Sequence, residues 1–220
     1  MIIAPSIMSM DFLNLKDQLE ILNEGTDWLH YDVIDGHFAP GMTVGPALMK
    51  PFVKGSQLPI DVHLMVNEPD KFIPGFIDGG AYSISFHYEQ YNCLDKCEET
   101  INFVKEKGVK AGLAINPATE VSTIEPLLNK VDLVLVMAVV PGYRDSYMKE
   151  AIEKVNVLDQ YRKQHDLHYL IQVDGGVNGD NLGPLLENGC DSVVAGGFIF
   201  KGDMQTNIAT MRRIEQEVNR

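Results

Sequence analysis

Short apolar segments alternate along the whole chain with longer segments of mixed polarity. The apolar segments are rich in Val, Ile and Leu, a composition typical of buried strands in parallel sheets. They cover residues 2–7, 28–34, 60–66, 82–87, 110–115, 131–139, 169–174 and 191–196. This alternation predicts parallel strands joined by crossover helices.

Each apolar segment is followed by a segment with helical character. We expect these helices within residues 11–25, 45–53, 68–80, 93–108, 116–130, 146–164, 179–189 and 205–218. Asp11 is the expected N-cap of the first helix, and Gly25 is its expected C-terminal stop. Eight strand–helix units in 220 residues predict an α/β protein whose residues 1–220 form a single (β/α)8 TIM barrel. An open doubly wound sheet is disfavoured, because no G-x-G-x-x-G follows the first strand.

Polar residues occupy strand positions that ought to be buried. His30 and Asp32 are two residues apart in one strand, so their side chains share a face. Burying an imidazole and a carboxylate together is costly unless something binds both. Active sites of (β/α)8 barrels lie at the carboxyl ends of the strands, where His63 and Asp174 are also expected.

These four residues suggest a metal site. Neutral imidazoles and carboxylates suit a divalent transition metal such as zinc, iron, manganese or cobalt, and the donor types do not choose among them. The metal would also offset the cost of burying the carboxylates. Other polar strand-end residues have ordinary interpretations. Asp35 and Asp61 are expected to be caps or turn residues, and His37, His165 and His168 to be solvated or near the surface.

Two glycine pairs follow the last two strands. Gly175–Gly176 and Gly196–Gly197 stand where barrel enzymes commonly bind phosphate through backbone N–H groups. Glycine permits close approach of the ligand to the backbone. The alternative is that the glycines only form tight turns between strand and helix.

Composition and charge limit the partners and the compartment. The formal net charge is −13, which disfavours nucleic acid and anionic membranes as partners. No apolar stretch reaches the roughly 18 residues needed to span a membrane, and the beginning of the chain lacks the basic region of a signal peptide. Three cysteines, Cys93, Cys97 and Cys190, do not form a disulfide framework, so we expect a cytoplasmic protein.

Seven stretches together resemble the ribulose-phosphate 3-epimerase family. They are APSIMSMDF, WLHYDVIDGHFAPGMTVGP, DVHLMV, KAGLAINPAT, VDLVLVMAVVPGY, QVDGGV and SVVAGGFIF, and they extend from about residue 3 to about residue 200. The stretch SIMSMDFLNLKDQLE also resembles the allulose-6-phosphate 3-epimerase branch of that family.

The resemblance implies a metal-dependent isomerase acting on a sugar phosphate. It implies one divalent metal, most often zinc, on His30, Asp32, His63 and Asp174, with Asp32 and Asp174 as the catalytic acid/base pair. The implied substrate contacts are Ser6, Met65, Met137, Gly142, Gly175, Gly176, Gly196 and Gly197.

A 3-epimerase removes the proton at C3 and returns one to the opposite face. Two carboxylates can share this task, and a metal stabilises the 2,3-enediolate between the two steps. The expected pair is D-ribulose 5-phosphate and D-xylulose 5-phosphate, and D-allulose 6-phosphate is the alternative substrate. A barrel decarboxylase is disfavoured, because HYDVID lacks the lysine of a DxKxxD signature. A non-catalytic sugar-phosphate-binding paralogue is disfavoured by the intact acid/base pair.

One loop departs from the family pattern. Where the family usually has NPGFGGQ, this chain has Val140 and, further on, Arg144, Asp145 and Ser146. We interpret Arg144 as a direct contact to the phosphate; the alternative is a surface pair with Asp145. A homo-oligomer is also expected, with Tyr31, Phe38 and Met42 as apolar side chains near the barrel mouth.

Overall fold

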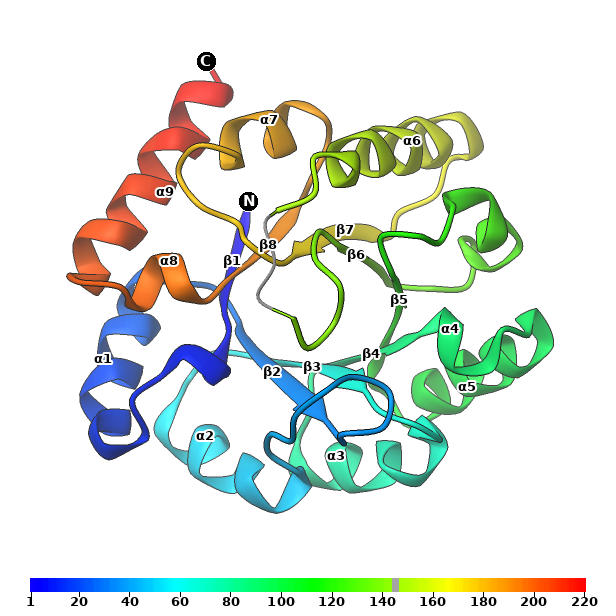
Figure 1. Ribbon diagram of the computed structural model, residues 1–220, viewed down its shortest axis with the longest axis horizontal. Coiled ribbons are helices and arrows are strands. Elements are labelled where there is room, and N and C mark those ends of the chain that lie inside the picture. Colours follow the sequence, from blue (N-terminus) through cyan, green and yellow to red (C-terminus); the bar gives the residue numbers. More distant parts are fainter. Residues whose placement is uncertain (144–146) are drawn as a thin grey trace.

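Eight parallel strands form one sheet at the centre of the molecule (Figure 1). The structure is a computed structural model that describes residues 1–143 and 147–220. The strands are β1 (Ile2–Pro5), β2 (Leu29–Ile34), β3 (Ile60–Met65), β4 (Ser83–His87), β5 (Lys110–Ile115), β6 (Leu133–Met137), β7 (Leu170–Asp174) and β8 (Ser192–Ala195). All eight lie within the segments predicted from the apolar pattern.

The sheet curls into a nearly closed barrel. Its strand order is β1-β8-β7-β6-β5-β4-β3-β2, so the first strand pairs with the last. A parallel bridge between Ser6 and His30 links the end of β1 to β2, which is the other edge of the sheet. This topology confirms the predicted (β/α)8 barrel.

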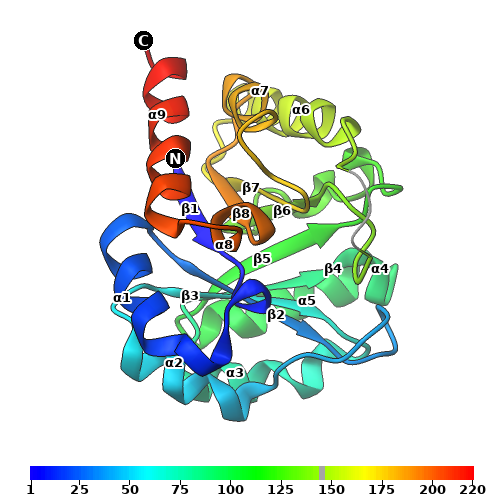
Figure 2. The ribbon, with the colours of Figure 1, turned by 60° about the vertical axis from the view of Figure 1, so that its left-hand side comes forward.

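Helices surround the barrel on its outside (Figures 1 and 2). They are α1 (Leu15–Gly25), α2 (Met49–Gly55), α3 (Ile73–Gly79), α4 (Tyr88–Tyr91), α5 (Leu94–Glu106), α6 (Glu150–His165), α7 (Leu182–Glu187), α8 (Gly197–Phe200) and α9 (Met204–Val218). Gly25 ends α1 as expected. Asp11 caps a 3₁₀ turn at Phe12–Asn14, directly before α1, by accepting a hydrogen bond from the Leu13 N–H.

The helix predicted for residues 116–130 is wrong. This segment contains only 3₁₀ turns at Val121–Thr123 and Glu125–Leu127. Pro126 lacks the N–H that a continuous helix needs, and its ring clashes with the preceding turn. The connection nevertheless returns the chain to β6, so the alternation of the barrel is preserved.

The alternation of side chains along each strand divides the core into two layers. Tyr31 and Val33 point outward into the large core between the strands and the helices. A smaller apolar cluster, which includes Leu135 and Met137, fills the inside of the barrel. Tyr31 is fully buried, so its expected contribution to an oligomer surface is wrong.

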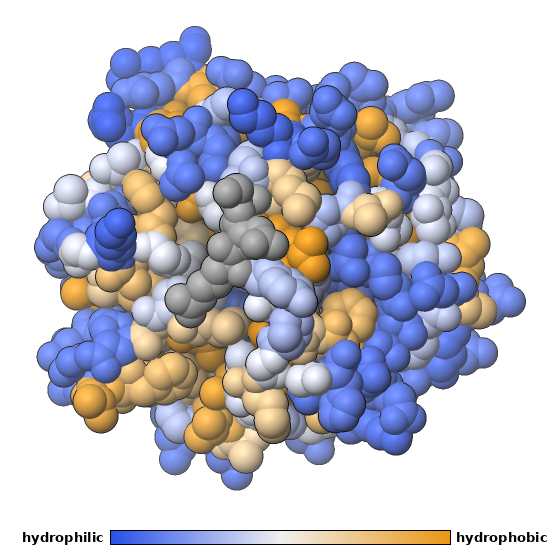
Figure 3. Space-filling view, in the orientation of Figure 1, coloured by the Kyte–Doolittle hydropathy of each residue, from blue (hydrophilic) through white to orange (hydrophobic). Residues whose placement is uncertain are grey.

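Several large apolar side chains are exposed next to α1 and α2. Figure 3 shows apolar residues gathered at the lower left of the displayed face, in the region of α1 and α2. Phe12 and Leu13 are exposed just before α1, Leu48 just before α2 and Val53 within α2, and Leu13 is 94% exposed. Within the described residues, no helix combines the length and apolar character needed to cross a membrane.

Candidate metal centre and substrate cavity

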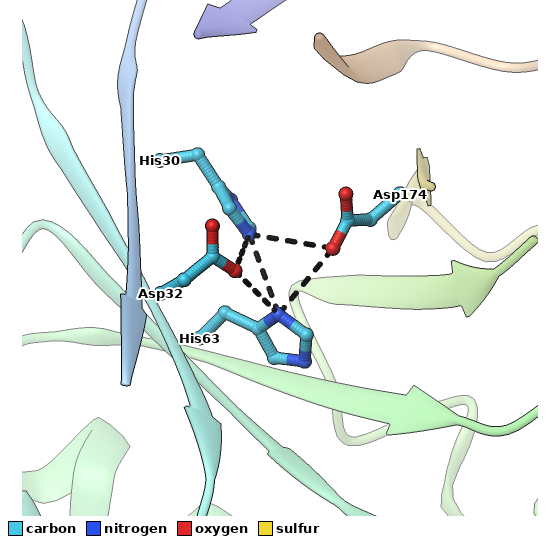
Figure 4. Close-up of side chains that lie close together, drawn as sticks. All are labelled: His30, Asp32, His63 and Asp174. Carbon is cyan, nitrogen blue, oxygen red and sulfur yellow. Dashed lines mark hydrogen bonds and ion pairs between the residues drawn. The ribbon is translucent and has the colours of Figure 1, made fainter. Parts of the chain in front are cut away.

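Strands β2, β3 and β7 bring His30, Asp32, His63 and Asp174 together inside the barrel (Figure 4). One ligand atom from each of these side chains lies within 4.8 Å of the others. Strand register accounts for part of this arrangement, because Asp32 is paired with His63 across β2 and β3. The side chains that the sequence predicted as metal ligands thus converge on one point.

The spacing of the ligand atoms fits a single metal ion. Asp32 Oδ1 lies 3.2 Å from both His30 Nε2 and His63 Nδ1, and these two nitrogens are 3.4 Å apart. Asp174 Oδ2 lies 3.6 Å from His63 Nδ1 and 4.0 Å from His30 Nε2. Tetrahedral ligands about 2.0–2.1 Å from zinc are separated by about 3.3 Å, close to these values.

The charge of the group also favours a cation. His30 Nδ1 lies 2.9 Å from Asp61 Oδ2, a carboxylate oxygen that can accept a hydrogen bond from Nδ1–H. The other ring nitrogen, Nε2, therefore faces Asp32 and Asp174. Burial opposes a charged imidazole, but Asp32 and Asp61 outweigh it and raise the pKa of His30 well above its ordinary value. Positive charge is therefore stabilised at the centre of the group, and a divalent metal would supply it.

The two carboxylates differ in environment. Burial raises the pKa of Asp174 to about 7, and the charge of Asp32 acts in the same direction. Burial acts in the same sense on Asp32, but the imidazoles of His30 and His63 outweigh it and lower the pKa of Asp32. The pKa values of two side chains of the same chemical type are thus displaced in opposite directions.

A cavity of about 570 Å³ adjoins the candidate metal group, which consists of His30, Asp32, His63 and Asp174. It is lined by Asp32 and Asp174 and by every predicted substrate contact within the described residues: Ser6, Met65, Met137, Gly142, Gly175, Gly176, Gly196 and Gly197. Arg144, predicted to contact the phosphate, lies outside the described residues. Ser6 Oγ donates a hydrogen bond of 2.5 Å to Asp32 Oδ2, which holds the carboxylate with Oδ1 toward the imidazoles.

The first glycine pair is required by the backbone conformation. Gly175 and Gly176 have φ values of +112° and +66°, in the region that side chains rarely adopt. A Cβ on Gly175 would also lie 2.5 Å from Val139 Cγ2. These constraints account for the glycines as turn residues, and they leave the backbone of the pair open to the cavity.

Several residues outside the predicted set belong to the site. Asp61 is fully buried against His30, so its interpretation as a cap or turn residue is wrong. The signal was present in the sequence, because Asp61 precedes His63 by two residues and therefore shares its face. Ser9 and Lys201 also line the cavity, and Lys201 is the one basic side chain among its described lining residues.

The remaining polar side chains behave as expected. Asp35 accepts hydrogen bonds from the backbone N–H groups of His37, Phe38 and Asn67, which makes it a turn residue. The side chain of His37 is 74% exposed. His165 and His168 are exposed at the surface.

Sequence comparison connects this geometry with known proteins. Residues 2–200 match the model of the ribulose-phosphate 3 epimerase family. The chain is 39% identical over 201 residues to the ribulose-phosphate 3-epimerase of Aquifex aeolicus, covering 90% of this chain and 89% of that protein. It is 38% identical over 216 residues to the ribulose-phosphate 3-epimerase of Bacillus subtilis, covering 96% of this chain and 97% of that protein.

Solved structures with a similar fold include proteins of much lower sequence identity. KGPDC from Streptococcus mutans superposes with a TM-score of 0.73 at 10% identity, covering 99% of this chain and 98% of that one. The 3-hexulose-6-phosphate synthase of Salmonella typhimurium gives a TM-score of 0.69 at 13% identity, covering 99% of this chain and the whole of that one. At this level of identity the two matches show a shared fold.

Proposed function

The chain belongs to the ribulose-phosphate 3-epimerase family, and on that premise we propose that it interconverts D-ribulose 5-phosphate and D-xylulose 5-phosphate. The observation that carries this proposal is the convergence of Asp32 and Asp174, from different strands, on one group of ligands (Figure 4). Both carboxylates also line the cavity. Two carboxylates that face a substrate from different sides can exchange a proton with either face of C3.

We propose that His30, Asp32, His63 and Asp174 hold one divalent metal ion. Zinc suits the donors and their spacing, and iron, manganese and cobalt accept the same donor types. The bound ion would supply Lewis-acid stabilisation of the negative charge that develops on the substrate oxygens.

The two carboxylates then divide the proton transfer. One of Asp32 and Asp174 removes the proton from C3, which leaves the substrate as a 2,3-enediolate. The other delivers a proton to the opposite face, and the roles exchange in the reverse reaction. Ser6 holds Asp32 in place through its hydrogen bond. Met65 and Met137 line the cavity without acidic protons of their own, so they can enclose the planar intermediate without protonating it.

We further propose that the glycine pairs bind the phosphate. Gly175, Gly176, Gly196 and Gly197 line one cavity, where backbone N–H groups can approach an anion closely. Lys201, which lines the same cavity, would supply positive charge, and Gly142 would contact the substrate from the loop after β6. Arg144 stays a proposed phosphate contact on sequence grounds.

Proton exchange in D₂O tests the reaction directly. Zinc-loaded protein is supplied separately with D-ribulose 5-phosphate and D-allulose 6-phosphate, and NMR follows deuterium at C3 and formation of each epimer. Exchange and epimerisation with the five-carbon sugar are expected. Turnover of the six-carbon sugar alone would replace the proposed substrate with the alternative, and no exchange with either sugar would contradict the epimerase.

Substitution of each carboxylate tests the proton transfer. Asp32→Asn and Asp174→Asn should each lower kcat by about 10²- to 10⁴-fold, since each removes one acid/base group. Asp180→Asn is the matched control, because Asp180 is an exposed residue in the connection after β7. Near-normal turnover in either active-site variant would exclude that residue from the proton transfer.

We also propose a cytoplasmic homo-oligomer. The three cysteines are free thiols, as in proteins of reducing compartments. Met42 is 82% exposed at the rim of the cavity, and apolar residues are exposed on the face described above. Light scattering coupled to size-exclusion chromatography measures the mass directly, and a mass of one chain would contradict the oligomer.

A further inference from the structure

A third imidazole, that of His87, contacts one of the two histidines of the metal group. His63 Nε2, on the side of the ring away from Asp32, lies 2.9 Å from the Nε2 of His87 at the end of β4. Both side chains are buried. At this distance one nitrogen donates a proton and the other accepts it. His63 Nδ1 faces the metal group, and the direction of this hydrogen bond determines whether Nδ1 carries a free lone pair or a proton.

Glu89 determines that direction. Its Oε2 lies 3.1 Å from His87 Nδ1, and an ionised carboxylate can only accept. The proton of His87 therefore sits on Nδ1, and Nε2 of the neutral ring accepts from His63 Nε2–H. The other carboxylate oxygen of Glu89 accepts from the Asn116 backbone N–H at 2.7 Å and from the Thr119 hydroxyl.

We propose that His87 and Glu89 are positioning residues that hold His63 in the tautomer whose Nδ1 lone pair faces the metal. This inference rests on the metal ligands named under the proposed function and adds a chain of two residues behind one of them. Metal-ligating histidines commonly donate their other N–H to a carboxylate or carbonyl, which fixes the tautomer. Here the carboxylate acts through an intervening imidazole.

The other ligand histidine shows the direct form of the same arrangement. His30 Nδ1 contacts the Asp61 carboxylate, which also accepts from Ser83 Oγ at 2.6 Å and Gln172 Nε2 at 3.0 Å. The chain thus orients its two metal-binding imidazoles by two routes. This difference supplies a matched control.

Glu89→Gln should reverse the proton order. The Asn116 N–H can only donate, so the new amide must turn its oxygen toward that group and its NH₂ toward His87. His87 Nδ1 must then accept, its Nε2 carries the proton, and His63 is left protonated on Nδ1, facing the metal position. We expect zinc affinity to fall about 100-fold, the upper end of the range for such partners.

Asp61→Asn makes the same chemical change without the reversal. The amide oxygen can still accept from His30 and Gln172, while its NH₂ meets Ser83 Oγ, a hydroxyl that can accept as well as donate. The expected loss of zinc affinity is therefore below about 10-fold. Thr119→Val is a second control, since it removes one donor to Glu89 but keeps the carboxylate.

Two readouts test the inference without any sugar. Competition with a chromophoric chelator gives zinc affinity, and long-range ¹H–¹⁵N NMR of ¹⁵N-histidine protein gives the His63 tautomer with and without zinc. Without metal, His63 is expected to carry its proton on Nε2 in the parent protein and on Nδ1 in Glu89→Gln. An unchanged tautomer, or an affinity within about threefold of the parent, would overturn the inference. An inactive protein with the expected tautomers would refute the proposed function and leave this inference standing.

A second pair of variants covers the case in which Glu89→Gln does not fold. His87→Gln keeps an acceptor for His63 and a donor for Glu89, whereas His87→Leu keeps only side-chain volume. The glutamine should restore most of the zinc affinity that the leucine loses. Equal affinities in the two variants would overturn the inference.

Discussion

Lys154 is buried in α6 and holds the loop that supports Glu89. Its ammonium group donates to the backbone carbonyls of Asn116 at 3.0 Å, Pro117 at 2.7 Å and Thr119 at 2.5 Å. The residue is 8% exposed. Lys154→Met keeps most of the apolar stem and removes all three donors. We expect the loop after β5 to lose its attachment to α6.

The structure sets the size of this effect. A hydrogen bond to a charged group contributes about 1.5–3 kcal/mol, but the three bonds share one ammonium and are not additive. The methionine also avoids the cost of burying a charge, so we expect a net loss of about 3–4 kcal/mol. At about 2–4 °C per kcal/mol for a protein of this size, Tm should fall by roughly 10 °C.

Thermal unfolding followed by circular dichroism measures the change. Lys163→Met is the control on the same helix: its side chain is 72% exposed and pairs with Asp159 at 2.6 Å. Lys163 is the exposed partner of this pair, and Arg162 still pairs with Asp159 after the substitution. The loss should therefore be at most about 1 kcal/mol, and Tm should fall by no more than about 4 °C. A Lys154→Met protein that melts with the control would refute the reasoning, because the buried contacts of Lys154 would then contribute no more than the exposed Lys163.

Three further predictions concern the site and the surface. Gly175→Ala should lower kcat by about 10- to 100-fold, since the added Cβ would lie 2.5 Å from Val139 and displace Asp174, the neighbouring proposed acid/base residue. Gly45→Ala, with open space around its Cβ, should leave kcat unchanged, and equal kcat values for the two variants in steady-state assays would contradict this prediction. A chelator should remove the proposed metal and lower Tm, and adding zinc should restore Tm, because free zinc at 1,000 times its Kd contributes about 4 kcal/mol; an unchanged Tm would contradict the proposed metal site. Burial raises the pKa of Asp159, but Lys163 and Arg162 outweigh it and lower that pKa. The contribution of Asp159 to stability is therefore present above the ordinary pKa of about 3.9 and is lost as the pH falls through the lowered value. Between pH 7 and pH 3, the free energy of unfolding in urea should fall less in Asp159→Asn than in the parent, and equal falls would contradict this prediction.

Local patterns in the sequence were sufficient to predict the barrel and the convergence of its main polar residues. Strand periodicity places His30 and Asp32 on one face, and parallel strands bring their carboxyl ends to one rim, where His63 and Asp174 also lie. These inferences need only side-chain alternation and a fold whose strands all run the same way.

Other features depend on which strands and loops become neighbours. Asp61 looked like a turn residue until the register of β2 and β3 placed it beside His30. The segment 116–130 forms 3₁₀ turns in place of the expected helix. At its beginning, the backbone N–H of Asn116 donates to the carboxylate of Glu89, 27 residues earlier in the chain.

The sequence by itself therefore determined the fold and the types of donor atom available at the barrel mouth, because both follow from periodicity and strand direction. The tertiary structure alone decided how the donors are oriented. The protons of His30 and His63 are directed by Asp61 and by the His87–Glu89 pair, through hydrogen bonds between neighbouring strands and loops. Hydrogen-bond direction depends on distances of about 3 Å between such elements, which no periodicity along one segment encodes.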